Sequence, residues 1–217
     1  MEKRMFVRQF RTGGDRNFGY LAADEESRQA LVVDPSYSPD SIASFAAEHS
    51  YAIAYVFCTH GHADHIEGNT AIEDLTGRKA LLFGDREETT GMVVDDGAAF
   101  PLGSLRLKII HTPGHTADSF CLHVGDALFT GDTLFVGKVG GTWTEKDAER
   151  EYASLHEKLM KLPSETRVFP GHDYGTAPES TIGAERATNP FLLQPDLKSF
   201  KDLKANWGEY KKKHGIP

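Results

Sequence analysis

The chain has 217 residues, of which 39% are apolar and 26% charged, and its formal net charge is −8. A chain of this length and composition can bury a full hydrophobic core, so we expect an ordinary soluble globular protein. The acidic excess argues against a nucleic-acid-binding or membrane-surface protein, and no apolar run is long enough to span a bilayer.

Two cysteines, Cys58 and Cys121, stand in apolar contexts and form no Cys-x-x-Cys pair. Thiols in such contexts are typically buried, and they stay reduced in cytosolic proteins. The N-terminal residues lead into no signal-peptide core. We therefore expect a cytoplasmic protein, and the sequence leaves open a homo-oligomer.

The first third of the chain alternates short apolar runs with turn residues, a pattern that predicts β-strands at residues 5–10, 18–23 and 30–33. The step from Asp34 to Pro35 ends the third strand, because proline restricts the residue before it. Residues 38–50 then predict a helix, with Pro39 just inside its start.

Residues 51–58 are an apolar run of strand length that ends directly at Thr59 and His60. Residues 66–77 predict a helix that Gly77 closes, with Ile66, Ile72 and Leu75 on its buried side. Further strands are expected at residues 80–83, 105–110, 120–124 and 127–130. A two-residue turn, Gly-Asp at 125–126, joins the last two as a hairpin.

The clearest helix is expected at residues 147–162, where apolar side chains recur at spacings of four, three, four and three. A last short strand follows at 167–169, and the tail from residue 178 is expected to be helical in two pieces, broken at Pro190 and Pro195. Strands dominate both halves of the chain while helices intervene. This order predicts two sheets packed together with helices outside, and it leaves the strand order open.

Histidine and aspartate residues follow four of the predicted strands. They are His60, His62 and His65 after 51–58, His115 after 105–110, Asp132 after 127–129, and His172 after 167–169. Loops at one edge of a sheet converge in space, so these side chains can meet. Imidazoles and carboxylates are common ligands of zinc and similar ions.

The segment His-Gly-His-Ala-Asp-His at 60–65 suggests two adjacent ions. Alternate residues of an extended loop point to one side, which suits His60 and His62 to one ion. Asp64 and His65, at the start of the next helix, project differently and suit a second. A carboxylate between them, Asp132, would bridge ions about 3.5–4 Å apart.

In combination these segments resemble the metallo-β-lactamase superfamily. They are Thr-His-Gly-His-Ala-Asp-His at 59–65, Thr-Pro-Gly-His at 112–115, Phe-Thr-Gly-Asp at 129–132 and Pro-Gly-His at 170–172. The resemblance covers nearly the whole chain and implies an α/β fold, an αββα sandwich of two mixed sheets. It implies a single domain over 1–217, with a short helical C-terminal extension from about residue 191.

Within the superfamily the chain is similar to the glyoxalase II (hydroxyacylglutathione hydrolase) and persulfide dioxygenase branch. The run Gly-Asp-Thr-Leu-Phe at 131–135 and the segments 180–185 and 189–191 carry this similarity. The resemblance implies that Asp34 lies behind the segment 59–65, here called the metal loop, and is hydrogen-bonded to it. It implies these ligands: His60, His62 and His115 for one ion, Asp64, His65 and His172 for the other, and Asp132 shared.

The activity so implied is thioester hydrolysis by a metal-bound hydroxide, with S-2-hydroxyacylglutathione or a related thiol ester as substrate. Two divalent ions are expected, zinc first, with iron or manganese as alternatives. Asp64 would also orient the nucleophile, Asp132 would bridge both ions, and Lys138 and Tyr174 are candidate substrate contacts.

The alternative activity is that of a persulfide dioxygenase with one Fe(II), held by His60, His115 and Asp132, that oxidises glutathione persulfide. Ala63 in the metal loop favours this alternative, whereas the run at 131–135 favours the hydrolase. Residues 137–142 depart from both glyoxalase II and the persulfide dioxygenases, because these relatives usually have Gly-Cys-Gly-Arg or Gly-Cys-Gly-Lys there. A non-enzymatic scaffold would be expected to lose ligands, and none is lost here.

Overall fold

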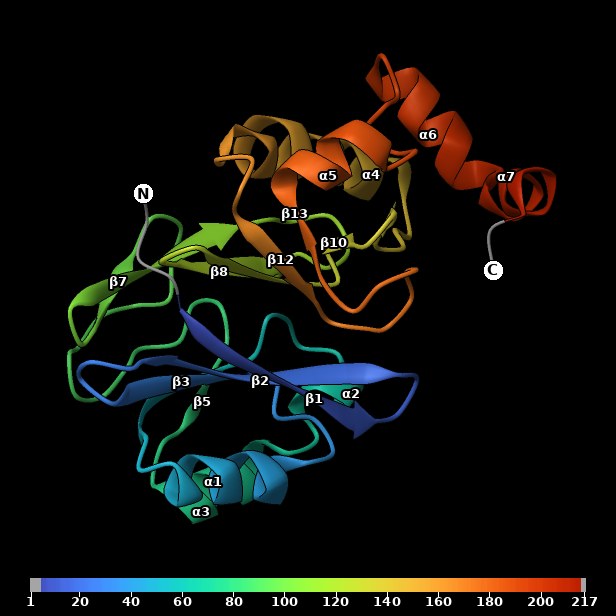
Figure 1. Cartoon of the computed structure of the whole chain (residues 1–217). Coiled ribbons are helices and arrows are strands. Elements are labelled where there is room, and N and C mark those ends of the chain that lie inside the picture. Colours follow the sequence, from blue (N-terminus) through green and yellow to red (C-terminus); the bar gives the residue numbers. More distant parts are fainter. Residues whose placement is uncertain (1–4, 216–217) are drawn as a thin grey trace.

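The computed structural model describes residues 5–215, and Figure 1 shows two β-sheets stacked face to face between helices. The first sheet has five strands in the order β1-β2-β3-β4-β5. Their bounds are β1 (Phe6–Gly13), β2 (Asn17–Asp24), β3 (Gln29–Val33), β4 (Ala52–Phe57) and β5 (Ala80–Leu81). The sheet is mixed, because β1, β2 and β3 pair antiparallel while β3, β4 and β5 pair parallel.

The second sheet has six strands in the order β13-β12-β9-β8-β7-β6. Their bounds are β6 (Ala99–Leu102), β7 (Leu105–His111), β8 (Phe120–Val124), β9 (Ala127–Gly131), β12 (Arg167–Pro170) and β13 (Ser180–Thr181). Only β12 and β9 pair parallel among the described strands of this sheet. A two-stranded ribbon of β10 (Leu134–Phe135) and β11 (Lys138–Val139) lies beside it.

Helices cover the outer faces of both sheets. Their bounds are α1 (Pro39–Glu48), α2 (Ala63–Ile66), α3 (Asn69–Thr76), α4 (Glu145–Ala153), α5 (Ile182–Thr188), α6 (Leu197–Ala205) and α7 (Trp207–His214). In Figure 1, α1 and α3 lie outside the first sheet, α4 and α5 lie outside the second, and α6 and α7 continue on that side. The predicted αββα sandwich is confirmed. Within residues 5–215 no helix has the length and apolarity needed to cross a membrane.

Strand β2 shows how the layers are held together. All eight of its residues are buried, because both faces of the sheet are covered at this strand. Phe18 and Tyr20 belong to the cluster between the sheets, whereas Leu21 and Ala23 belong to the cluster under α1 and α3. Burial of a large apolar side chain stabilises by about 1.5–3 kcal/mol, so a register slip of one residue would lose several such terms.

The helix predicted over residues 66–77 is interrupted in the structure. It begins earlier, as α2, and resumes as α3 after Gly68. A Cβ atom at Gly68 would lie 2.3 Å from the Ser36 carbonyl oxygen, so the chain bends where two backbone segments touch. The prediction that Leu75 is buried was wrong, since 50% of it is exposed, while Ile72 is fully buried.

The ends of the other predicted helices also differ. The long helix begins at Glu145 and changes its winding after Ala153, through a π-helical turn (Ser154–Lys158) and a 3-10 turn (Leu159–Lys161). The tail has three helices rather than two, because Asn206 separates α6 from α7. The strands β6, β10, β11 and β13 were not expected, since segments of two to four residues are too short to show a period.

Candidate metal centre

Seven imidazole and carboxylate side chains meet where several strands end. They follow β4, β7, β9 and β12, and three sets of three have ligand atoms within 4.8 Å of one another. The sets are His60, His62 and His115; His60, His65 and Asp132; and Asp64, His65 and His172. The structure therefore brings together all seven residues that the sequence indicated as metal ligands.

The first set is built from the metal loop and from the loop after β7. The Nδ1 atom of His62 lies 2.9 Å from Nε2 of His60 and 3.0 Å from Nε2 of His115. The three rings stand nearly perpendicular to one another, with interplanar angles of 78° to 87°. Their nitrogens thus converge on one small volume from three directions, as ligands of a tetrahedral ion do.

The second set lies beside the first and includes a carboxylate. Nε2 of His65 is 3.3 Å from Nε2 of His172, and the Asp64 carboxylate oxygen Oδ2 is 3.4 Å from the latter atom. The His65 side chain is fully buried, whereas a third of the Asp64 side chain is exposed. Asp64 therefore stands at the boundary between the buried centre and solvent.

Asp132 lies between the two sets. Its Oδ2 is 3.5 Å from Nε2 of His115, and its Oδ1 is 3.4 Å from Nε2 of both His65 and His172. Oδ1 is buried and has no hydrogen-bond partner. A buried carboxylate oxygen without a donor is costly, and a cation between the rings would satisfy it. The donor set and this orphaned oxygen fit a pair of divalent ions.

The outer nitrogens of two rings are held by backbone carbonyl groups. Nδ1 of His115 is 2.8 Å from the Gly141 carbonyl oxygen, and Nδ1 of His172 is 2.8 Å from that of Asp15. A ring that donates its Nδ1–H outward presents the lone pair of Nε2 inward. Both rings are thereby fixed in the tautomer that a metal ligand needs.

Asp34, at the end of β3, fixes two further rings. Its carboxylate accepts the Thr59 backbone N–H at 2.7 Å, the Thr59 hydroxyl at 2.9 Å and Nδ1–H of His65 at 3.0 Å. Because the Thr59 hydroxyl donates to Asp34, its oxygen accepts from Nδ1 of His60, 3.2 Å away. One buried carboxylate therefore orients a histidine of each set.

Burial and neighbouring charges shift the pKa values of the centre in different directions. Burial lowers the pKa of His60 well below its usual value, so this ring is neutral and able to bind a metal. Burial acts the same way on His65, but Asp34 and Asp132 outweigh it and raise the pKa of His65 well above its usual value. Although burial favours the neutral acid, His172 and His65 hold the pKa of Asp132 well below its usual range.

Sequence reasoning did not find two residues that support the metal loop. Asn17, in β2, donates through Nδ2 to the Asp64 carboxylate at 2.8 Å. The Asp118 carboxylate accepts the Gly61 backbone N–H at 3.0 Å. Neither residue lies in a segment with a metal-ligand pattern, and their partners are 47 and 57 positions away.

The two candidate substrate residues form a cationic and aromatic rim beside the centre. The Tyr174 ring stacks on the His172 ring at 4.6 Å, and its hydroxyl donates to the Asp15 carboxylate at 2.6 Å. The Lys138 ammonium lies 4.5 Å from the centre of the Tyr174 ring, and the Arg16 guanidinium lies 4.8 Å from it. Two positive charges therefore flank the Tyr174 ring, which itself stacks on His172, in a chain of negative net charge.

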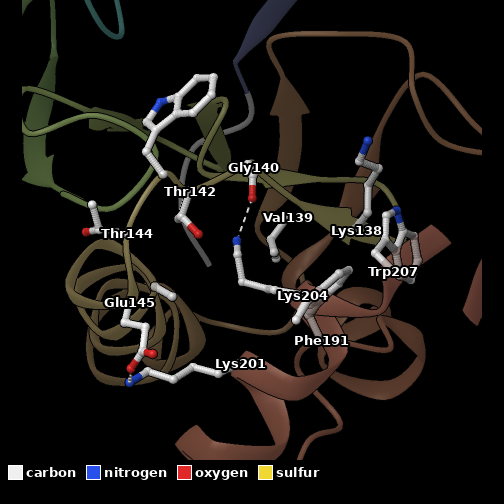
Figure 2. Close-up of a pocket in the computed structure, with 14 residues that line it drawn as sticks. Lys138, Val139, Gly140, Thr142, Thr144, Glu145, Phe191, Lys201, Lys204 and Trp207 are labelled. Atoms are coloured by element: carbon white, nitrogen blue, oxygen red, sulfur yellow. Dashed lines mark hydrogen bonds and ion pairs between the residues drawn. The ribbon is translucent and has the colours of Figure 1, made fainter. Parts of the chain in front are cut away.

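A cavity of about 360 Å³ adjoins the loop between β11 and α4. Its walls include Lys138, Gly141, Trp143, Lys204 and Trp207, and Figure 2 shows Lys204 reaching from α6 to the Gly140 carbonyl group. The Gly141 carbonyl that receives Nδ1–H of His115 belongs to the same loop. The cavity and the metal centre therefore share a wall.

The residues just before that loop are held by α5 and by the adjoining Asn189. The Glu185 carboxylate accepts the Gly137 backbone N–H at 2.9 Å and the Asn189 amide at 2.8 Å. Asn189 also donates to the Lys138 carbonyl oxygen at 3.2 Å. The segments around 185 and 189 thus hold in place the loop at which the sequence departs from its relatives.

Comparison with known families gives a match over most of the chain. The family model described as "Metallo-beta-lactamase superfamily" matches residues 12–172. This range contains all seven side chains of the centre and also Asp34.

The curated relatives include hydroxyacylglutathione hydrolases. The chain is 38% identical to those of Polaromonas sp. strain JS666 and Nitrosococcus oceani, over 78% and 73% of its own length. The alignments span 67% and 63% of those relatives, so the chain matches about two thirds of their length. Among solved structures, ETHE1 from Myxococcus xanthus superposes with a TM-score of 0.83 at 33% identity and covers 94% of this chain and 91% of that one.

Proposed function

Because the chain belongs to the metallo-beta-lactamase superfamily, we propose that it is a metal-dependent hydrolase that cleaves a thioester such as S-2-hydroxyacylglutathione. The convergence of five imidazoles and two carboxylates around the orphaned Oδ1 of Asp132 carries this proposal. The names of the two hydroxyacylglutathione hydrolases support the substrate class.

The proposed ligands follow the two sets of the centre. His60, His62 and His115 would hold one ion, Asp64, His65 and His172 a second, and Asp132 both. Zinc is the first choice, because nitrogen and oxygen donors without thiolate suit it, and iron or manganese would accept the same donors. Bound ions supply Lewis acidity, since they polarise a carbonyl oxygen and lower the pKa of a coordinated water.

The protein's own groups have distinct tasks in such a cleavage. The partly exposed Asp64 carboxylate, held at Oδ2 by Asn17, is placed to orient the attacking oxygen. A thiolate leaves without prior protonation, because its conjugate acid is far stronger than an alcohol or amine. The reaction therefore needs no separate general acid.

The rim supplies a binding site for the anionic part of the substrate. Lys138 and Arg16 are placed to attract the carboxylates of a glutathione moiety, and the Tyr174 ring forms the surface between them. Burial and the neighbouring cations Lys211 and Arg16 lower the pKa of Lys138, although Asp132 and Asp15 act in the opposite direction.

A second candidate is a persulfide dioxygenase with a single Fe(II). The observation in its favour is the superposition on ETHE1, which covers 94% of this chain and 91% of that one. His60, His115 and Asp132 would then hold the iron.

Metal analysis of protein purified without oxygen, followed by two assays, separates the candidates. Hydrolysis of S-lactoylglutathione by the zinc-loaded protein, with two ions per chain, is the result expected of the hydrolase. Oxygen uptake with glutathione persulfide, one iron per chain and no thioesterase activity would overturn that proposal and establish the dioxygenase.

A further inference from the structure

Lys204 of α6 is an ionic residue in an unusual place, because only 11% of its side chain is exposed. Its ammonium group donates to the Gly140 carbonyl oxygen at 2.6 Å and to the carboxylate of Glu151, a fully buried residue of α4. Buried ion pairs stabilise folds little or not at all, because desolvation offsets the Coulomb attraction. Fold stability alone therefore does not account for an ion pair in this position.

One arm of the pair leads to the metal centre through a glycine turn. Gly140 is pressed against the centre, since a Cβ atom there would lie 2.0 Å from the Asp132 carbonyl oxygen and 3.2 Å from Cβ of His115. The next residue, Gly141, accepts Nδ1–H of His115. The position of the Gly140–Gly141 turn thus decides where the outer nitrogen of His115 finds its partner, and Lys204 holds that turn from the other side.

The second arm leads to the segment just before His115. A Cβ atom at Gly114 would lie 2.4 Å from Cβ of Glu151, so the backbone of this segment rests directly on α4 at Glu151. One turn further along, the Ser154 hydroxyl donates to the Pro113 carbonyl oxygen at 2.9 Å. The backbone that carries His115 and the turn that orients its ring are therefore both tied to the Lys204–Glu151 pair.

We propose that Lys204, through Glu151 and the Gly140–Gly141 turn, is a positioning residue for His115. Helix α6 thereby sets the geometry of the ion that His60, His62 and His115 would hold. This inference rests on the metal centre of the proposed function, but not on the choice of substrate. Loss of contacts that orient a ligand typically weakens metal binding about 10–100-fold, so an effect of this size is expected at one of the two ions.

Co²⁺ binding to the whole metal-free chain tests the proposal. Titration against a competing chelator gives the affinity of each ion, and the visible absorption of bound Co²⁺ reports the coordination geometry. The test variants are Lys204→Met and the double variant Glu151→Gln/Lys204→Met, in which no buried charge is left unpaired. The matched control is Lys201→Met, on the same helix, whose ammonium binds Glu149 at 2.6 Å and does not contact the turn.

The expected result is an affinity lower by about 10–100-fold for one Co²⁺ ion and an altered visible spectrum in both test variants, with Lys201→Met like the wild type. A purely structural role would lower the melting temperature of the metal-free protein and leave the spectrum unchanged. The proposal is overturned by affinities within about threefold of wild type in the double variant, or by an equal loss in Lys201→Met. A wild-type protein that binds no Co²⁺ would instead overturn the proposed function.

Discussion

Replacement of Asp34 by asparagine tests how the metal loop is organised. Asp34 is buried and its backbone has a φ angle of 47°, a left-handed conformation that asparagine tolerates better than alanine does. Asp34→Asn therefore changes the side-chain chemistry with little strain in the backbone. The amide has one acceptor oxygen, where the carboxylate serves three donors from Thr59 and His65.

The expected effect follows from these three contacts. When the asparagine NH₂ group occupies the position of Oδ2, it donates a hydrogen bond where the carboxylate oxygen accepted one. Nδ1 of His65 must then become the acceptor, and its proton moves to Nε2, which faces the metal centre. The Thr59 hydroxyl also loses its acceptor, so its oxygen is no longer held as the acceptor for Nδ1–H of His60. Each charge-assisted bond contributes about 1.5–3 kcal/mol, so we expect about 10–100-fold weaker binding at both ions.

Zinc titration with a competing chelator gives the affinities, and ¹⁵N NMR of the imidazoles shows which nitrogen of His65 carries the proton. Asp118→Asn is the matched control, because this carboxylate accepts the Gly61 N–H of the same loop but contacts no ligand ring. We expect the control to bind zinc within a few-fold of wild type. The reasoning is refuted if Asp34→Asn keeps both ions at wild-type affinity with His65 protonated at Nδ1.

Three further predictions concern substrate binding, catalysis and folding. Lys138→Met should raise KM for S-lactoylglutathione about tenfold with kcat nearly unchanged, because the charge contributes uniform binding; an equal fall in kcat would contradict this. Asn17→Ala should lower kcat about tenfold, since Asp64 loses its fixed orientation, while zinc stoichiometry stays the same. Asp126→Asn should lower the free energy of unfolding of the metal-free protein at pH 7 by about 1–2 kcal/mol, because the bidentate Arg167 contact is lost. Burial alone would raise the pKa of Asp126, but Arg167 outweighs it and lowers this pKa in the folded protein. The stability difference between wild type and Asp126→Asn should therefore shrink as the pH falls below about 4, and vanish once the pH passes below the lowered pKa. Urea unfolding at pH 7 and pH 3 measures this change in the difference.

Several features of the fold and of the centre could be predicted because they have local causes. The strands before the metal loop and before Asp132 are apolar runs, and each run stops where polar residues begin. The Gly125-Asp126 turn forms the predicted hairpin, with Val124 and Ala127 as its last pair and Gly125 at a φ angle of 53°. Short spacings within one segment also indicated that His60 and His62 act together.

Other features depended on which segments the two sheets bring together. The helix is interrupted at Gly68, where the Ser36 backbone leaves no room for a side chain, and no periodicity in residues 66–77 records that contact. The short strands at the sheet edges form because longer neighbours offer them hydrogen-bonding partners, not because of their own pattern.

The sequence by itself determined which residues are candidate metal ligands and that they follow the strands of a layered α/β fold. Only the tertiary structure decided how each ring is oriented and which groups orient it. The Asn17–Asp64 and Lys204–Gly140 contacts span 47 and 64 positions, and each depends on the spacing between packed layers. Such contacts leave no local signal, because the free energy that fixes them comes from the burial of the whole sandwich rather than from the segments in which the residues lie.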